Sequence, residues 1–296
     1  MRVLIVASYN KGRFTSFVSE QAEALSRHGC EVSLFGVKGK GVLGYLRNLP
    51  LLKDAIRAFN PDLIHAHYGL CGLLATLQQE VPVVVTFHGS DLNEPFVRPF
   101  SLLAMRRADQ SVFVSKAMMG NHMGVLLPCG VDLPTEVMPV PQGVLAAGKK
   151  HVLFAGAFSN QVKDAVLAHK VVDTLDTVQL IELQGYSRNE VTALMQSADA
   201  LLVTSKSEGS PQVIKEALVC GLPIVSVNVG DVAERVDGVD GCFVARTREP
   251  EELRHLLLQA LAFGARTKGR DRIIHDGLTN DAVARQLITI YQRITQ

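Results

Sequence analysis

Short apolar runs alternate with amphipathic segments along most of the chain, beginning with Arg2-Val-Leu-Ile-Val-Ala7. Short apolar runs bounded by turn residues are typical of buried strands, and apolar positions with a period of about 3.6 are typical of helices. The alternation predicts an α/β fold with parallel sheets covered by helices. In the first half we expect strands at 2–7, 31–35, 62–65, 81–87 and 110–114, and helices at 14–28, 49–59, 70–79 and 96–107.

The alternation stops between residues 134 and 149, where Pro and Gly are frequent, and a second series begins at His151. We therefore predict a domain at 1–134, a linker at 135–149, a second domain at 150–279 and a final helical segment at 280–296, with Asn280 as its cap. The second series predicts strands at 151–155, 178–183, 199–204, 223–227 and 241–245, and helices at 162–173, 188–197, 211–220, 249–264, 267–276 and 280–294.

Composition narrows the class of protein. Hydrophobic residues make up 47% of the chain and charged residues 20%, which is ordinary for a soluble α/β protein, and the net charge of +1 gives no indication of nucleic-acid binding. No apolar run approaches the roughly 20 residues of a membrane span. The first strand is too short for a signal peptide, and the five cysteines show no paired spacing. These features predict a cytoplasmic protein with reduced thiols.

The most informative stretch runs from Val203 to Glu216. It reads as the end of a buried strand, a turn of small residues that carries Glu208, and a helix with Pro211 in its first turn. Such a turn presents backbone N–H groups and the positive end of a helix to an anion. Because a carboxylate beside phosphate is electrostatically unfavourable, we expect Glu208 and Glu216 to accept hydrogen bonds from the hydroxyl groups of a sugar or a ribose.

Three other strand-end segments are candidates for ligand contact, each with a plainer alternative. His88 follows a wholly apolar strand in Thr86-Phe-His-Gly-Ser-Asp91, or else it caps the strand while Asp91 caps the next turn. Gly12 lies in the first strand–helix turn and would allow a ligand to approach, or it only makes the turn. Lys163 precedes a helix and would point its charge at a phosphate, or it is a solvated lysine.

Two further patterns carry less weight. Gly39-Lys-Gly41-Val-Leu-Gly44 fits the dinucleotide-binding spacing, but it follows the second strand and leads to no clear helix start, so we expect a basic surface loop. His65 and His67 share one face of a strand, and with His88 they suggest zinc. No carboxylate or cysteine at a suitable spacing completes the set, so hydrogen-bonding histidines explain the pattern better than a metal site.

The ordered series of motifs resembles family 4 of the retaining, nucleotide-sugar-dependent glycosyltransferases of the GT-B fold. The resemblance is strongest at Glu208-Gly-Ser-Pro-Gln-Val-Ile-Lys-Glu216, which matches the family's E-x7-E element, and is similar there to the teichuronic acid and exopolysaccharide branch. It implies two Rossmann-like domains that face each other across a cleft. It also implies metal-independent transfer of a sugar from a UDP- or GDP-sugar to a hydroxyl of a glycan or lipid-linked acceptor. Further matches lie at Pro61–His67, Thr86–Asp91, Val114–Lys116, Leu127–Asp132, Gly221–Pro223 and Gly230–Glu234.

The resemblance also implies roles for individual residues. Glu216 would bind the ribose diol, Lys163 would neutralise the diphosphate, and Glu208 and His88 would lie beside the donor sugar. Gly12 would admit the diphosphate, and the final helix would cross back to brace the first domain. The predicted catalytic residues are Glu208, His88 and Lys163, and the predicted donor-binding residues are Gly12, Gly185, Tyr186, Gly209, Ser210, Pro211, Gln212 and Glu216.

The sequence departs from the family pattern in two places. Most relatives carry an arginine where this chain has Ala157, which weakens leaving-group stabilisation unless Arg13 or a backbone N–H substitutes. The second domain lacks about one strand–helix unit, so its sheet should be smaller. These departures leave open a non-catalytic nucleotide-sugar-binding or scaffold subunit. A sugar-nucleotide epimerase, which can use the same two-domain fold, is a second alternative, but it needs a base and acid pair near the sugar, which the Thr86–Asp91 stretch does not resemble.

The helix at 96–107 has two interpretations. Its apolar residues are flanked by Arg98, Arg106 and Arg107, so it either rests on anionic lipid at the inner membrane surface or is a core helix with basic ends.

Overall fold

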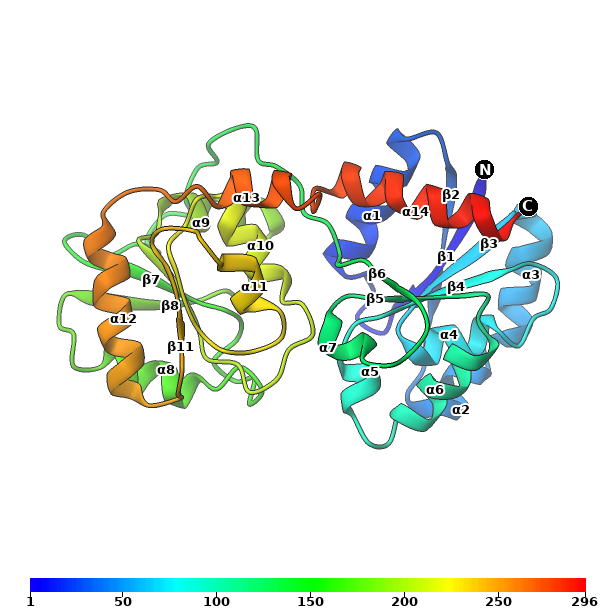
Figure 1. Cartoon of the computed structure of the whole chain (residues 1–296), viewed down its shortest axis with the longest axis horizontal. Coiled ribbons are helices and arrows are strands. Elements are labelled where there is room, and N and C mark those ends of the chain that lie inside the picture. The colour runs from blue at the N-terminus through cyan, green and yellow to red at the C-terminus, as the bar shows by residue number, and fades with distance from the viewer. The chain divides into compact units, whose positions relative to one another are not determined.

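The computed structural model describes all residues from 1 to 296, and the chain divides into two compact units. Unit 1 comprises Met1–Gly130 and Leu278–Gln296, and unit 2 comprises Val131–Gly277. Each unit is a parallel sheet with helices on both faces (Figure 1). The predicted α/β fold with two parallel sheets is therefore confirmed.

Unit 1 is built on a six-stranded sheet in the order β2-β1-β3-β4-β5-β6. The four strands β1, β3, β4 and β5 are largely buried runs, and every pair in the sheet is parallel. Because parallel neighbours end at the same edge, the segments that follow β1, β3 and β4 emerge together. The strands are β1 Arg2–Ser8, β2 Glu31–Val37, β3 Leu63–His67, β4 Val83–Phe87, β5 Gln110–Phe113 and β6 Val125–Leu126.

The helices of unit 1 cover the sheet with two apolar cores. One core packs α1 and α14 against one face, and the other packs α3 and α4 against the opposite face. α14 spans Asn280–Ile294, and the cap is Thr279, whose hydroxyl accepts a hydrogen bond from the Ala282 N–H at 3.2 Å, so the prediction of Asn280 as the cap is wrong. The remaining helices are α1 Ser16–Arg27, α2 Gly41–Leu46, α3 Leu49–Phe59, α4 Gly69–Ala75, α5 Ser90–Asn93, α6 Arg98–Arg107 and α7 Lys116–Met119.

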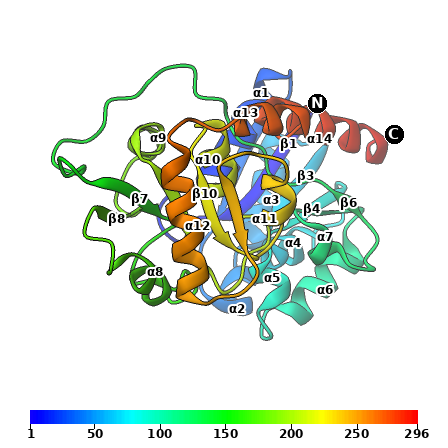
Figure 2. The same cartoon turned by 60° about the vertical axis from the view of Figure 1, so that its left-hand side comes forward.

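Unit 2 is built on a five-stranded sheet in the order β11-β10-β9-β7-β8, one strand fewer than in unit 1. One apolar core joins α8 and α12 to the sheet, and Figure 2 shows α12 lying along it. The strands are β7 Lys150–Phe154, β8 Val178–Glu182, β9 Ala200–Val203, β10 Ile224–Val227 and β11 Cys242–Ala245. The helices are α8 Ala165–Val172, α9 Arg188–Ser197, α10 Gln212–Val219, α11 Val232–Val236, α12 Pro250–Phe263 and α13 Gly269–His275.

The Pro- and Gly-rich segment between β6 and β7 contains no helix, and hydrogen bonds attach it to unit 2. The Met138 N–H donates to the Gln196 side chain at 2.9 Å, and the Gln196 amide donates to the carbonyl of Glu136 at 2.8 Å. The Ala146 N–H donates to Gln179 at 2.9 Å. Residues that the sequence suggested as linker are therefore hydrogen-bonded to α9 and β8 of unit 2.

The expected loop at Gly39–Gly44 is wrong, since Gly41–Leu46 forms the short helix α2. A Cβ added at Gly39 would come within 2.6 Å of the Gly44 carbonyl oxygen, and Gly39 has a φ of +128°. The glycines therefore serve a close approach of the chain to itself. No helix in the protein is long and apolar enough to cross a membrane.

Candidate active site

In unit 2, the segments with candidate chemistry follow the three adjacent strands β9, β7 and β8. The chain passes from β7 to β8 on one side and then returns to β9 on the other, so β7 and β9 form the topological switch point. Open α/β sheets bind ligands at such points, beyond the carboxyl ends of the strands. Lys163 follows β7 and Glu208 follows β9, which places both residues at this point.

Lys163 and Glu208 form an ion pair. The Lys163 Nζ lies 2.6 Å from Oε1 of Glu208, and the two side chains are 22% and 17% exposed. The stem of Lys163 lies over Gly156, where an added Cβ would come within 3.0 Å of the Lys163 Cγ. A glycine after β7 therefore gives the lysine room to reach the carboxylate across the switch point.

Hydrogen bonds from Thr204 fix the backbone around Lys163. The buried Thr204 hydroxyl lies 2.8 Å from the Lys163 carbonyl and 3.0 Å from that of Asp164. Asp164 has a left-handed conformation with a φ of +55° and caps α8 through the Leu167 N–H. Arg248 donates to the Asp164 carboxylate at 2.8 Å and to the Ser205 carbonyl at 2.9 Å. Lys163 therefore lies in a turn whose backbone is held by these hydrogen bonds.

Glu216, on α10, forms a second ion pair. Its Oε1 lies 2.6 Å from Nη1 of Arg188, with exposed side-chain fractions of 13% and 36%. Arg188 is the first residue of α9, and Ser187 caps that helix in a capping box with Glu190. The sequence reasoning missed Arg188, although a cation at the positive end of a helix is unfavourable and could have marked it.

The turn from Gly209 to Gln212 leads into α10, and Pro211 is the N-cap residue with no side-chain hydrogen bond. A Cβ added at Gly230 would lie 2.7 Å from the Gly209 carbonyl oxygen, and Gly230 has a φ of +59°. The β10–α11 loop therefore supports this turn from behind, and glycine is needed for the close approach.

The hydroxyl of Ser210 is used within the protein. It donates to the Asp231 carboxylate at 2.9 Å and accepts from Lys215 Nζ at 3.3 Å. Lys215 is fully buried. Burial raises the pKa of the Asp231 carboxyl, and the nearby Lys215 charge opposes that shift. The sequence reasoning missed both partners of Ser210.

The other predicted donor-binding residues of unit 2 lie in the loop between β8 and α9. Gly185 is exposed with a φ of +85°, and Tyr186 is half-buried two residues before Arg188. The β8 carboxylate of Glu182 accepts from the Phe158 N–H at 2.6 Å and so holds the β7–α8 loop beside it. Ala157 lies half-buried in that same loop.

In unit 1, Asp91 organises the segment that contains His88. Its carboxylate accepts hydrogen bonds from the backbone N–H groups of His88, Gly89 and Gly69 at 3.1, 2.8 and 3.2 Å. The side chain is buried, which raises its pKa, while these hydrogen bonds oppose the shift. Asp91 therefore caps the turn, as the plainer alternative predicted, and the cap fixes the backbone at His88.

His65, His67 and His88 form one hydrogen-bonded cluster. His67 Nδ1 lies 3.0 Å from His88 Nε2, and His65 Nε2 lies 2.7 Å from the Thr86 hydroxyl. His65 and His67 are fully buried, which lowers the pKa of His67 to about 3 and that of His65 well below its usual value. No group of three or more His, Cys, Asp or Glu side chains is arranged to hold a metal ion.

Gly12 lies in the turn between β1 and α1, in unit 1 with His88. It has a φ of +69°, and no atom lies within 4 Å of a Cβ built there. The left-handed backbone therefore explains the glycine, and the space beside it is open. Of the three predicted catalytic residues, Lys163 and Glu208 contact each other in unit 2, and His88 lies in unit 1.

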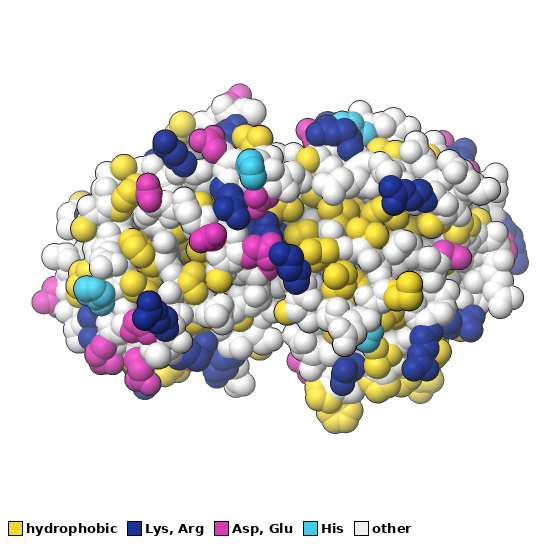
Figure 3. All heavy atoms as spheres, viewed as in Figure 1, with side chains coloured by type: hydrophobic (Ala, Val, Ile, Leu, Met, Phe, Trp, Pro, Cys, Tyr) yellow, Lys and Arg dark blue, Asp and Glu magenta, His cyan; other side chains and the backbone are white.

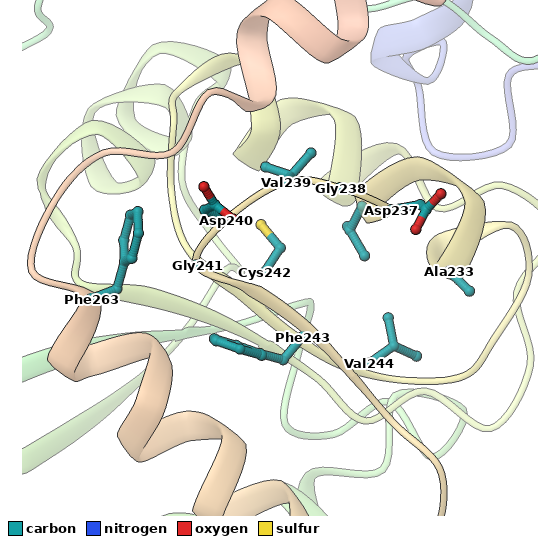
Figure 4. A pocket seen from close by; sticks show the side chains of 11 residues that line it. Ala233, Asp237, Gly238, Val239, Asp240, Gly241, Cys242, Phe243, Val244 and Phe263 are labelled. Carbon is teal, nitrogen blue, oxygen red and sulfur yellow. The ribbon is translucent and has the colours of Figure 1, made fainter.

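A pocket of about 580 Å³ lies beside β11, one of the two edge strands of unit 2 (Figure 4). None of the predicted site residues lines it. Phe243 and Phe263 contribute apolar walls, and Asp237 and Asp240 lie at the turn before the strand. Burial raises the pKa of the Cys242 thiol to about 11, so the thiol lacks the thiolate character of a nucleophile.

Two family models match successive parts of the chain. One, described as Glycosyltransferase Family 4, matches residues 15–133, and another, described as Glycosyl transferases group 1, matches residues 142–262. An uncharacterized glycosyltransferase of Methanocaldococcus jannaschii is 27% identical over 76% of this chain and 72% of its own. The putative teichuronic acid biosynthesis glycosyltransferase TuaC of Bacillus subtilis is 28% identical over 60% of this chain and 56% of its own.

Solved structures match over almost the whole length. Sucrose-phosphate synthase from Thermosynechococcus elongatus has a TM-score of 0.80 at 17% identity, covering 99% of this chain and 98% of its own. Anabaena Alr3699/HepE in complex with UDP has a TM-score of 0.74 at 15% identity, covering 99% and 100%. The UDP-GlcNAc 2-epimerase of Methanocaldococcus jannaschii has a TM-score of 0.59 at 12% identity, covering 99% and 100%.

The structural matches at these identities show the fold, which glycosyltransferases share with the epimerase. The fold alone does not identify the family, but the two glycosyltransferase family models do, since together they span most of the chain in sequence order. The chain belongs to family 4 of the glycosyltransferases and has the GT-B fold.

Proposed function

We propose that the protein transfers a sugar from a UDP- or GDP-sugar to a hydroxyl of a glycan or lipid-linked acceptor in cell-surface polysaccharide synthesis, with retention and without a metal. The proposal rests on two ion pairs in unit 2. One joins Lys163 and Glu208 at the topological switch point, and the other joins Arg188 and Glu216. The named function of TuaC and the UDP bound to HepE support the choice of substrates.

Each ion pair supplies one part of donor recognition. Lys163 places a compact positive charge where the leaving diphosphate accumulates negative charge, and a preorganised charge of this kind stabilises the transition state. Glu216 accepts hydrogen bonds from the ribose diol, which replaces its contact with Arg188. Glu208, released from Lys163 by the phosphate, faces the donor sugar. Gly185 and Tyr186 receive the nucleobase.

Unit 1 supplies the acceptor side of the reaction. His88 contacts the donor sugar near the reacting carbon, and the open space beside Gly12 admits the diphosphate. The acceptor hydroxyl attacks on the face that the diphosphate leaves, and the departing phosphate takes its proton. No side chain is assigned as a nucleophile.

Two alternatives are distinguished by experiment. The purified protein is incubated with radiolabelled UDP- and GDP-sugars and an extract that contains lipid-linked acceptors. Transfer of label to the acceptor supports the proposal. Nucleotide release at background with intact UDP or GDP binding favours a binding or scaffold subunit, which is the alternative that Ala157 suggests. Conversion of the free donor to its epimer favours an epimerase.

We further propose that α6 and its preceding loop contact anionic lipid to reach a lipid-linked acceptor. Phe96 is 89% exposed and Leu103 is 45% exposed, while Arg98 and Arg106 are exposed near them. Figure 3 shows hydrophobic side chains gathered over this end of unit 1, with Lys and Arg side chains nearby. Exposed aromatic and basic residues together are typical of interfacial segments.

Vesicle sedimentation tests the lipid contact. We expect binding to phosphatidylglycerol vesicles and not to phosphatidylcholine vesicles, and we expect Phe96→Ser to weaken it about tenfold, since it removes most of an aromatic side chain from the interface. Val137→Ser, at an 87% exposed position in unit 2, is the control. Equal binding by wild type and Phe96→Ser would contradict the proposal.

A further inference from the structure

Gln21, on the buried face of α1, contacts both His65 and His67 and joins them in one hydrogen-bonded cluster. We propose that its amide fixes the tautomer of His88, so that His88 carries its proton on Nδ1. Gln21 is thus a positioning residue for His88, acting through His67. That His88 uses this proton on the donor sugar rests on the proposed function.

The amide nitrogen of Gln21 lies within reach of two imidazoles. Its Nε2 is 3.2 Å from His65 Nδ1 and 3.5 Å from His67 Nε2. A carboxamide nitrogen carries two N–H groups, so it donates to both rings at once. A neutral imidazole has one donor and one acceptor nitrogen, and a nitrogen that accepts from Gln21 obliges the other nitrogen of its ring to carry the proton.

The constraint passes from His67 to His88. With Nε2 of His67 accepting, its proton is on Nδ1, which lies 3.0 Å from His88 Nε2. His88 Nε2 then accepts, and the proton of His88 is on Nδ1, on the side of the Cys129 sulfur at 3.8 Å. The rings of Phe17 and Tyr68 lie 4.8 and 4.4 Å from the His88 ring and hold its plane.

The opposite end of the chain of hydrogen bonds is consistent with the same assignment. His65 Nδ1 lies 2.6 Å from the Tyr291 hydroxyl and 3.2 Å from Gln21 Nε2, so its one lone pair is shared between these two donors, and His65 Nε2–H donates to Thr86. Burial holds His65 and His67 neutral, so no second proton removes the distinction between their nitrogens. Reversing the Gln21 amide would reverse every donor and acceptor from Gln21 to His88. The amide is therefore the group to test.

The tautomer of His88 is read by long-range ¹H–¹⁵N NMR correlations in the full-length protein, with His88→Asn to assign its signals among the nine histidines. We expect predominantly Nδ1–H in the wild type. Gln21→Met keeps an unbranched side chain of similar length and removes the donor, so we expect the His88 signals to shift toward the Nε2–H form. Gln79→Met, at an exposed position of unit 1, should leave them unchanged. Nε2–H in the wild type, or an unchanged tautomer in Gln21→Met, overturns the proposal.

A kinetic measurement tests the use of that proton. If the protein releases nucleotide from a UDP- or GDP-sugar, we expect Gln21→Met to lower kcat about tenfold and to leave the donor KM nearly unchanged, as expected for a group that acts in the transition state. An unchanged kcat with a shifted tautomer overturns the role of the His88 proton. An inactive wild type with the expected tautomer contradicts the proposed function alone.

Discussion

The strand ends of the two units use different electrostatics. In unit 2 the polar groups are ionised and paired, as Lys163 with Glu208 and Arg188 with Glu216. In unit 1 the corresponding groups are neutral imidazoles and hydroxyls joined by hydrogen bonds, with His65 and His67 fully buried. Partly exposed ions exchange partners with an incoming ligand, whereas a buried neutral network keeps its partners and fixes orientation. Unit 2 is therefore suited to binding a charged donor, and unit 1 to holding one imidazole in place.

The strongest test of the charged side is Lys163→Ala. If the lysine stabilises the leaving diphosphate, we expect kcat to fall by a factor of about 100 to 1,000, the usual loss when one preorganised donor is removed. Nucleotide release from radiolabelled donor measures it. Lys170→Ala, at an exposed position on α8, should retain full activity. Equal rates in the two variants would remove the role of Lys163.

Nucleotide affinity tests the second ion pair. Glu216→Gln removes the charge that accepts from the ribose diol, and hydrogen bonds to charged groups contribute about 1.5–3 kcal/mol, so we expect UDP or GDP binding to weaken by about 10- to 100-fold. Calorimetric titration checks this, with Glu251→Gln on α12, 76% exposed, as the control. Unchanged affinity would leave Glu216 with a structural pairing to Arg188 and no ligand role.

Low pH should lower the free energy of unfolding of unit 1, because its buried histidines are neutral in the folded state. Folded His67 stays neutral down to a pKa of about 3, while the unfolded chain takes up its proton near pH 6.5, so the unfolded state binds more protons between these values. The free energy of unfolding should therefore fall as the pH drops below 6.5, by about 1.4 kcal/mol per pH unit for each such histidine. Hydrogen exchange of the β3 amides measures the trend. His67→Gln should reduce the slope by the contribution of one histidine, since His65 remains, and an equal slope in both proteins would contradict the neutral state of His67.

The smallest expected effect is that of Tyr291→Phe. It removes the hydroxyl that lies 2.6 Å from His65 and leaves the ring in the core, so we expect a loss of about 1 kcal/mol in the stability of unit 1. Thermal unfolding of the variant is compared with Tyr9→Phe, at a half-buried position of the same unit. A wild-type melting temperature would show that the hydroxyl contributes orientation and no stability.

Local patterns predicted the elements better than the contacts between them. Strands such as 2–7 and 199–204 were predicted within a residue or two, because a buried parallel strand is an uninterrupted apolar run. Gly39–Gly44 was misjudged as a loop because glycine propensity gives no indication that Gly39 and Gly44 pack on each other. Thr279 and Asn280 are both good caps, and the sequence alone does not rank neighbours.

The candidate site divides in the same way. The E-x7-E element identified Glu208 and Glu216 as candidates, because both residues lie in one short stretch of sequence. Their roles stay predictions. Their partners Lys163 and Arg188 come from the segments after other strands, and only the sheet order brings them together. Gln21 and Tyr291 lie in no recognisable motif, so no sequence pattern indicated their contacts with the histidines. Tyr291 is 226 residues from His65, and no periodicity connects the two positions.

The return of α14 to unit 1 has a consequence for synthesis of the chain. Tyr291 reaches the ribosome's exit 226 residues after its partner His65, which at about 5–20 residues per second is a delay of about 10–45 s. During that interval the residues of α1 have been synthesised, but unit 1 lacks the helix that completes one of its two cores. The nascent protein must therefore carry an uncovered apolar face while unit 2 is translated and folds, and this is the period in which we expect a chaperone to be needed most.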